Sequence, residues 1–352
     1  MNPDNIYLNV TFNHDSRYGN APSPAVYNVT KNTPIINKCN DYYCSVIRFD
    51  IPLDQIPLFI MPSAGEANIN ITPLKIGIFA NDGTLATENI IFIPNGPFIV
   101  PSPQQSATSP YFYVFSIDHL IDMVNNALAA AYVIAYPGHT LINCPFFNYD
   151  PTTELISINY PDGFITNVNT RVSYIIMNNE LSTFLDGFYT KSNGDNNANG
   201  SDYEFIFDGM TINLYQDING IEYYKNTQEY NVVPMWAQLR KIVIVTSSIP
   251  TFPEYVQLNS NLGNNTSLRI VTDFVLSFNQ AGESRSLAVY NSTSQYRLID
   301  LLSDSSLYTI DLQIFWIDRL GNTLPLMISV YQQASIKMAF LKKDLYKKTM
   351  TN

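Results

Sequence analysis

Carboxylates are the side chains of this sequence that could most readily do chemistry. Two pairs lie close together along the chain, Asp300 with Asp304 and Asp311 with Asp318. Two carboxyl groups that face one cleft could act as the acid and the nucleophile or base of a glycosidase. A β-rich chain with 30 acidic residues offers such pairs by chance, however. We therefore predict that the protein is not an enzyme, and we assign no catalytic residue.

The histidines and cysteines do not suggest a catalytic or metal site. The three histidines are scattered, so they do not have the spacing of a zinc site, and three cysteines cannot form a disulfide framework. The sequence also lacks the glycine-rich loops that bind phosphates and dinucleotides, and the Gly-x-Ser-x-Gly turn of hydrolases. We predict reduced thiols, no metal, no cofactor and no defined ligand-binding residue.

Tyrosine is abundant, with 24 residues, and it forms three local groups: Tyr42 with Tyr43, Tyr111 with Tyr113, and Tyr223 with Tyr224. Aromatic groups of this density could form a sugar-binding platform or a protein interface. Partly buried aromatics of strands and loops are the commoner explanation, and we prefer it.

The composition limits the possible partners. The chain has 352 residues, only 14% of them charged, and a net charge of -11, so the body of the protein should not bind nucleic acid in general. No apolar run reaches the ~18 residues needed to span a bilayer, and the N-terminus has no secretion signal. The exception is the C-terminal tail, residues 342–352, where four lysines and one aspartate give a side-chain charge of +3. This tail could contact nucleic acid or an acidic neighbour, or it could simply keep the last strand soluble.

The elements that would position these residues are mostly strands. Apolar residues alternate over 307–317 and again over 334–341, separated by turn residues at 318–322. Period-two alternation predicts strands with one buried face, and we expect these two in one antiparallel sheet. Further long strands are predicted at residues 6–12, 42–51, 240–246 and 268–278, with an interrupted strand over 286–290 and 295–301.

The middle of the chain has a different pattern. A hairpin with strands at 74–79 and 89–93 is predicted around Asn81-Asp82-Gly83, and a proline-rich stretch then suggests a domain boundary. Ser116 can cap a helix with apolar residues at three- and four-residue spacing. Shorter strands follow at 155–160 and 172–177, and a second hairpin is predicted from 203–207 and 211–215.

Counting the first hairpin as one irregular strand, the two ends of the chain supply about eight long strands. Eight strands in two facing sheets is the number found in a jelly roll. We therefore predict a mainly β protein: a single jelly-roll β-sandwich formed by residues 1–97 and 236–352, with an inserted, β-rich α+β domain formed by residues 98–235. Residues 13–40 are expected to be an irregular arm.

Several stretches resemble one protein family in the same order along the chain. These are Arg48–Pro52, Ile244–Pro250 followed by Glu254, Tyr296–Leu301, Ile310-Asp311 through Pro325-Leu326, and Ala334–Lys337. They resemble the penton, or minor capsid, proteins of virophages and Polinton-like viruses, especially those of Sputnik-like virophages. The resemblance covers roughly residues 42–57 and 232–343. Each motif by itself is only a packing or turn signal. The resemblance depends on the motifs occurring in the same order along the chain as in the family.

The resemblance implies a structural capsid protein of the virion, with five copies forming a homopentamer at each icosahedral vertex beside the major capsid protein. It implies no enzymatic role. The alternative is a carbohydrate-binding jelly roll, which would act as a lectin or attachment protein. The size of the particle in solution separates these two hypotheses.

Overall fold

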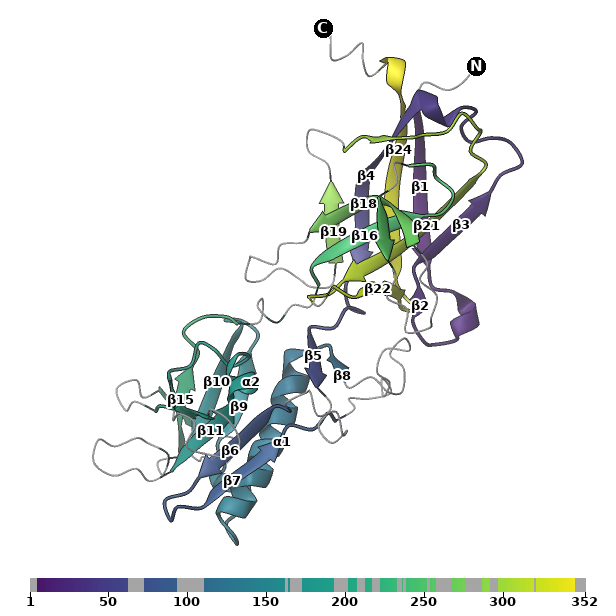
Figure 1. Ribbon diagram of the computed structural model, residues 1–352. Coiled ribbons are helices and arrows are strands. Elements are labelled where there is room, and N and C mark those ends of the chain that lie inside the picture. The colour runs from purple at the N-terminus through teal and green to yellow at the C-terminus, as the bar shows by residue number, and fades with distance from the viewer. Residues whose placement is uncertain are drawn as a thin grey trace. The chain divides into compact units, whose positions relative to one another are not determined.

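The protein is built from two compact units (Figure 1). In the computed structural model, unit 1 comprises Met1–Ile56 and Gln238–Asn352, and unit 2 comprises Pro57–Ala237. The structure describes residues 5–62, 73–93, 111–161, 164, 173–192, 202–207, 213–216, 222–232, 236, 239–251, 254–257, 267–275, 287–291, 297–319 and 321–345. Both units consist mainly of β-strands, as predicted.

Unit 1 contains two antiparallel sheets. The strand order of the first sheet is β1 (Asn5–Asn13), β24 (Gln333–Lys342), β4 (Tyr42–Pro52) and β19 (Leu287–Asn291), with β20 (Ile299–Asp300) also paired to β4. The order of the second is β17 (Tyr255–Gln257), β18 (Ser267–Val275), β16 (Lys241–Thr246), β21 (Thr309–Ile317) and β22 (Thr323–Pro325), with β3 (Val26–Thr30) also paired to β21. A short pair, β2 (Ser23–Pro24) with β23 (Met327–Ile328), and the 3-10 helices Ser16–Tyr18 and Cys39–Asp41 complete the unit.

The core of unit 1 lies between these two sheets. The alternating residues Ile310, Leu312, Ile314 and Trp316 of β21 enter it from the second sheet, and Ile336 of β24 is among those that enter it from the first. Trp316 is 3% exposed, which confirms the buried face predicted for this strand. Burial of alternate side chains from two facing sheets is the main stabilising term of such a sandwich.

The structure corrects the expected pairing of β21 and β24. They were predicted to share one sheet, but β21 pairs with β16, β3 and β22, whereas β24 pairs with β1 and β4. The turn residues after β21 lead instead to the short β22, which folds back onto β21. The two longest alternating segments therefore face each other across the core.

Strand β16 is apolar on both faces, as its near-continuous apolar run predicts. Ile242 and Ile244 lie in the main core. Val243 and Val245 point to the other side, where they belong to a second cluster that includes Phe315. A central strand with both faces covered needs no alternation of apolar and polar residues.

Unit 2 contains two larger sheets, one helix of several turns and a short strand pair. The first sheet has the order β12 (Thr190–Ser192), β13 (Asp202–Phe205), β11 (Tyr174–Asn178), β6 (Lys75–Phe79) and β7 (Leu85–Asn89). The second has the order β14 (Asn213–Gln216), β15 (Glu222–Thr227), β10 (Leu155–Tyr160) and β9 (Phe146–Asp150), and β5 (Phe59–Pro62) pairs with β8 (Tyr111–Val114). The remaining helices are α2 (Asn179–Ser182) and the 3-10 turn Leu141–Asn143.

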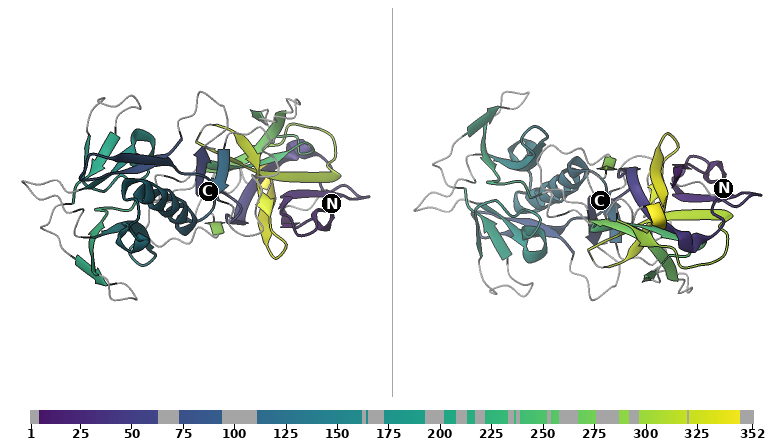
Figure 2. Two further views of the ribbon diagram at one scale, coloured as in Figure 1. Left: turned by 90° about the horizontal axis from the view of Figure 1, so that it is seen from below. Right: turned by 90° about the horizontal axis from the view of Figure 1, so that it is seen from above.

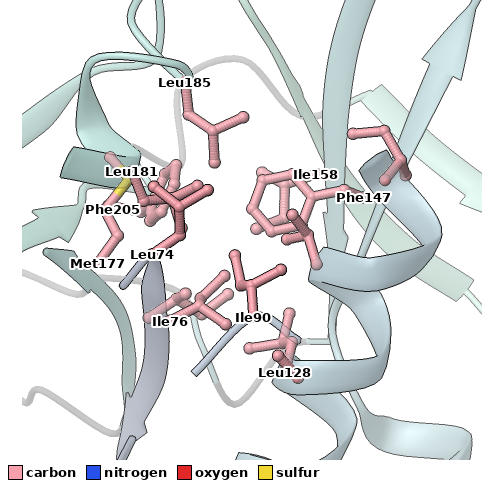
Figure 3. Close-up of a cluster of buried hydrophobic side chains, with 14 of the residues drawn as sticks. Leu74, Ile76, Ile90, Leu128, Phe147, Ile158, Met177, Leu181, Leu185 and Phe205 are labelled. Carbon is pink, nitrogen blue, oxygen red and sulfur yellow. The ribbon is translucent and has the colours of Figure 1, made fainter. Parts of the chain in front are cut away.

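Helix α1 (Ile117–Ala135) lies between the two larger sheets of unit 2, as the views in Figure 2 show. It begins where predicted, because the Ser116 hydroxyl accepts a hydrogen bond from the backbone N–H of His119. Figure 3 shows Leu128 of this helix beside Ile76 and Ile90, with Phe147 and Ile158 contributed by the other sheet. The helix therefore packs against both sheets, which also meet directly where the ring of Phe147 in β9 contacts that of Phe205 in β13.

The structure also corrects the domain boundaries. The predicted hairpin at Asn81–Gly83 exists as β6 and β7, but β6 pairs with β11 of unit 2. Residues 57–93 therefore do not belong with unit 1, and the predicted division between residues 97 and 98 is wrong. Unit 1 resumes at Gln238, two residues after the predicted position 236. The second predicted hairpin is wrong too, because β13 and β14 lie in different sheets.

Candidate interaction surfaces

Asp311, a candidate catalytic carboxylate by sequence, joins β21 to the turn that follows β16. One of its oxygens accepts hydrogen bonds from Thr246 Oγ1 (2.8 Å) and Ser248 N (2.6 Å). The other accepts from Ser247 N (2.8 Å) and Ser247 Oγ (2.7 Å). Four donors therefore hold this carboxylate in a structural role.

The charge of Asp311 also argues against acid catalysis. Burial by itself raises the pKa of this carboxyl group, but hydrogen bonds from Ser248, Ser247 and Thr246 outweigh it and lower the pKa to about 2. A general acid at neutral pH needs a pKa raised toward 7. Asp311 is instead ionised at any pH above the acid range.

The other predicted carboxylates are occupied by local contacts. Asp318, at the opposite end of β21 from Asp311, accepts hydrogen bonds from the backbone and side-chain nitrogens of Asn322 at 2.8 Å. Seven residues of extended strand place it roughly 23 Å from Asp311, well beyond the ~5–10 Å between paired glycosidase carboxylates. Asp300 pairs with Lys343, and Asp304 with Lys38. None of these arrangements resembles a hydrolytic site.

The histidines are separate from one another. His14 Nε2 lies 2.7 Å from the Ala21 carbonyl oxygen, and His119 Nε2 lies 2.6 Å from that of Ile93. The ring of His139 packs beside Tyr136. Within the described part of the chain, no three His, Cys, Asp or Glu side chains are grouped so that they could hold a metal ion.

All three cysteines are buried free thiols. Burial raises the pKa of Cys44 and of Cys144 to about 12, and it also raises that of Cys39. A thiol with so high a pKa is a poor nucleophile at neutral pH. These residues act as small apolar side chains in the cores.

The tyrosine groups do not form an exposed aromatic platform. Tyr42, Tyr113 and Tyr223 are buried in the protein interior. Tyr43 and Tyr224 are half-buried, and the side chain of Tyr111 lies outside the described residues. The interpretation as partly buried strand aromatics therefore fits better than a sugar-binding surface.

The first side of unit 1, called flank one here, consists of the edge strands β1 and β3. The rings of Phe12 and Tyr27 meet edge to face, with centroids 6.2 Å apart, and close the sandwich along this side. The exposed residues of the two strands are polar but uncharged, with one tyrosine and one valine: Asn5, Tyr7, Asn9, Thr11, Asn13, Val26, Asn28 and Thr30.

The opposite side, flank two, consists of β18 and β19 with the short β17. Here Phe274 and Tyr290 are in ring contact, with centroids 4.8 Å apart, and close the sandwich. The exposed residues are mostly apolar: Tyr255, Val275, Leu287, Val289 and Asn291. The nearby charges bind one another, because Asp273 contacts both Lys241 (3.1 Å) and Arg297 (2.8 Å).

Both chain termini leave the same end of unit 1, since Asn5 pairs with Leu341 (Figure 1). The Lys343 ammonium lies 2.8 Å from an Asp300 carboxylate oxygen and 5.1 Å from the ring centre of Tyr43. This lysine is therefore held by the unit itself. Lys342 is the last residue of β24, and the other two tail lysines, Lys347 and Lys348, lie outside the described residues.

The sequence prediction missed two elements of these flanks, β17 and the longer β3. Strand β3 lies inside residues 13–40, which were predicted to be an irregular arm, and the structure pairs it with β21. The signal was a short alternation over Val26–Thr30. The side chains of Val26, Asn28 and Thr30 are exposed, and those of Tyr27 and Val29 are half-buried. Prolines on both sides obscured it.

No helix in the described part of the chain has the length and apolar character needed to cross a membrane.

Two curated proteins and two solved structures are similar to the chain. It is 29% identical over 208 residues to "Structural protein V19" of Sputnik virophage, which covers 57% of this chain and 95% of the relative. It is also 29% identical over 146 residues to "Uncharacterized protein V18" of Sputnik virophage, covering 37% of this chain and 83% of that protein.

The structural likeness extends over nearly the whole chain. A chain in the cryo-EM structure of the Sputnik virophage superimposes with a TM-score of 0.81 and 28% identity, covering 98% of this chain and 99% of that one. The crystal structure of the mavirus penton protein gives a TM-score of 0.65 at 14% identity, covering 96% and 99%. The latter likeness shows a common fold.

The sequence pattern of one family spans almost the entire chain as well. The family described as Sputnik minor capsid protein V18/19 matches residues 6–342, which include both segments of unit 1 and all of unit 2. A carbohydrate-binding role is not favoured by any of these relatives. The chain therefore belongs to the Sputnik V18/19 family of minor capsid proteins and is a structural protein of a viral capsid.

Proposed function

We propose that this protein is a penton subunit, five copies of which form a ring at each vertex of an icosahedral capsid. In this proposal unit 1 is a single jelly roll and unit 2 is a domain inserted into it. The observation that carries the proposal is the whole-chain likeness to a chain of the Sputnik virophage, supported by the fold shared with the mavirus penton protein.

The strand pairing of unit 1 supports the jelly roll. Its eight principal strands, in chain order, are β1, β3, β4, β16, β18, β19, β21 and β24. The first pairs with the eighth, the second with the seventh, the third with the sixth and the fourth with the fifth. This nested pairing is what an antiparallel ribbon acquires when it is rolled into two facing sheets, the jelly-roll arrangement.

The position of the insertion follows from the same count. Unit 2 is placed between the third and fourth strands, β4 and β16, and the chain leaves β4 at the end of the sandwich opposite the termini. A jelly roll tolerates a long insertion there because the two connecting points lie in one loop and the core is otherwise complete. The two units indeed have separate hydrophobic cores.

A ring of five requires two different, mutually complementary flanks on each subunit, because a heterologous contact must close on itself. Flank one, with its asparagines and threonines, and flank two, with its valines and leucine, meet that requirement. We further infer that the ring borders capsomers of the major capsid protein, and that the basic C-terminal tail contacts the packaged genome or an inner capsid protein.

We also infer that the role is structural rather than catalytic. The carboxylates singled out by sequence each serve a local hydrogen bond or ion pair, as Asp311 and Asp318 illustrate. The buried thiols and the separated histidines offer no alternative set of catalytic groups within the described residues.

The test is the mass and shape of the purified full-length protein. Mass photometry at increasing protein concentration should show a species near 199 kDa, five times the 39.8 kDa of one chain. Negative-stain images of that species should show fivefold rings. A protein that remains a 39.8 kDa particle at high micromolar concentration, across a range of salt, would contradict the proposal.

A further inference from the structure

We infer that both flanks of unit 1 are contact surfaces between copies of this chain, and that flank one of each copy docks on flank two of the next. The inference rests on the proposed function and adds the partner and the residues of the contact. It is carried by an unusual feature of the edge strands, which is their lack of charge.

Four strands at the sheet edges on the two flanks, β1, β3, β17 and β19, together contain 22 residues and not one Asp, Glu, Lys or Arg. At the 14% charged composition of this chain, about three charged residues would be expected among them. The two-residue β20, which lies beyond β19 along the same side of β4, adds Asp300, and this carboxylate is paired with Lys343. Flank two carries charges on β18, which lies inside the edge: Arg269 and Asp273. Asp273 is engaged by Lys241 of β16 and by Arg297.

A bare edge strand presents unpaired N–H and C=O groups that invite pairing with another chain. Monomeric proteins prevent this with charged side chains, particularly lysine, or with proline and bulges along the edge. Strands β1, β3, β17 and β19 have no such charges, and the exposed side chains of β1, β3 and β19 include Tyr7, Val26, Leu287 and Val289. Edges of this kind are typical of surfaces that a partner covers.

The lack of charge on the edge strands of both flanks identifies the arrangement of copies. A twofold dimer formed through either flank leaves the other flank of both copies bare. A closed ring, in which flank one meets flank two, covers both flanks of every copy with a single kind of contact. Removing uncharged polar and apolar groups from water also costs less free energy than removing ions, so the edge strands of either flank can be buried with a small desolvation penalty.

One lysine placed on either flank should therefore prevent the contact. We would substitute Thr11→Lys on flank one and Val289→Lys on flank two, both at exposed positions on edge strands. The matched controls are Thr140→Lys and Val133→Lys in unit 2, where both parent residues are also exposed. Val133 and Val289 are almost equally exposed, at 51% and 53%.

Each flank variant should raise the concentration needed for half-assembly by on the order of 100-fold or more, because a lysine would be buried without a partner. The controls should assemble like the parent. Thermal melts of all four variants should match the parent, and Leu287→Lys replaces Val289→Lys if the latter melts early. Flank variants that form rings as readily as the controls would overturn the inference.

Mixing the two variants tests whether flank one docks on flank two or each flank pairs with its own kind. If flank one docks on flank two, Thr11→Lys and Val289→Lys are each monomeric alone, and an equimolar mixture forms a capped 1:1 dimer through the two intact flanks. If each flank instead pairs with its own kind, each variant forms a homodimer alone, and mixing adds nothing. The second result would refute the docking of flank one on flank two.

The parent protein separates failure of this inference from failure of the proposed function. Rings in the parent that persist in both flank variants would place the contact elsewhere and leave the penton proposal standing. A parent that stays monomeric under all conditions would refute the penton proposal and the ring contact together. If the parent forms only dimers, and one of the flank variants abolishes them, that flank is a contact surface but the ring is excluded.

Discussion

At the scale of single residues, Asp311 shows how a carboxylate selected as a chemical candidate can be a structural one. It accepts hydrogen bonds from three successive residues, Thr246, Ser247 and Ser248, and so fixes the turn at the end of β16 against β21. Both segments belong to the stretches by which the sequence resembles penton proteins. The likeness in this region is therefore explained by a buried hydrogen-bond network.

This network predicts a specific dependence of stability on pH. The folded-state pKa of Asp311 is about 2, against an ordinary value of 3.8. A lowered carboxyl pKa adds stability that is complete above the unfolded pKa and is lost as the pH falls through the folded one. The shift corresponds to about 2 kcal/mol at neutral pH.

Urea unfolding of the parent and of Asp311→Asn between pH 2 and pH 7 measures this contribution. The variant should be less stable by at least roughly that amount at pH 7, and the difference should shrink between pH 4 and pH 2. A difference that stays constant over this range would show that the charge of Asp311 does not matter.

Trp316 provides a second residue-scale prediction. It is 3% exposed in the core between the two sheets of unit 1. Trp316→Ala should lower the free energy of unfolding by roughly 3–5 kcal/mol, because it removes a large buried side chain and leaves a cavity. Tyr331→Ala is the control, since Tyr331 is 99% exposed and its loss should cost less than about 0.5 kcal/mol. Equal melting of the two variants would contradict this account of the core.

At the scale of elements, β24 is held by its neighbours almost to the last described residue of the chain. Its residues 335–341 are paired with β1 on one side and lie along β4 on the other. At its end, Lys342 still pairs with Tyr42, and Lys343 is held by Asp300 and Tyr43. Only the residues beyond Leu345 can serve as a tail without disturbing the sheet.

We therefore predict that a truncation removing residues 346–352 leaves the melting temperature and ring formation nearly unchanged. It should reduce genome retention or incorporation into capsids, because Lys347 and Lys348 are lost and contacts of lysine with phosphates are electrostatic. Lys347→Gln with Lys348→Gln should reproduce the effect without shortening the chain. Normal incorporation and genome content in both variants would show that the tail only aids solubility.

At the scale of the whole molecule, the net charge is divided very unequally between the units. Unit 1 contains 15 basic and 13 acidic residues, a net charge of +2. Unit 2 contains 4 basic and 17 acidic residues, a net charge of -13. The negative charge of the chain, -11 in total, therefore comes from unit 2. The uncharged edge strands of the flanks belong to the nearly neutral unit 1.

Five chains at -11 carry 5 × -11 = -55, so their mutual repulsion should oppose ring formation at low ionic strength. Salt should relieve this repulsion over a Debye length of ~8 Å at physiological strength. We predict that sedimentation velocity shows stronger ring formation as salt rises from low to moderate concentration.

The distribution of charge sharpens this prediction. Neutralising the exposed Asp122 and Glu229 of unit 2 to their amides should reduce the salt requirement. Ring formation that weakens with added salt would instead mean that attractive charge pairs dominate the contact between copies, contrary to the uncharged edge strands of the flanks.

The elements with a strong local pattern could be predicted from the sequence alone. Alternation located β1, β4, β10, β21 and β24, and a capping serine with helical spacing located the start of α1. These features depend on contacts between near neighbours in the chain, on the period of the side chains and on the backbone at the helix end. The mainly β character and the family resemblance follow from the same local signals, as does the expected burial of Trp316.

The tertiary structure alone decided which strands are neighbours. Alternation shows that a strand has a buried face, but it does not show which sheet supplies the opposite face. For this reason β21 and β24 were assigned to one sheet although they lie in two, and the hairpin of β6 and β7 was assigned to unit 1 although it pairs with β11. The two flanks depend on the same long-range pairing, because β1 and β3 become edge strands only once β24 and β21 occupy their other sides.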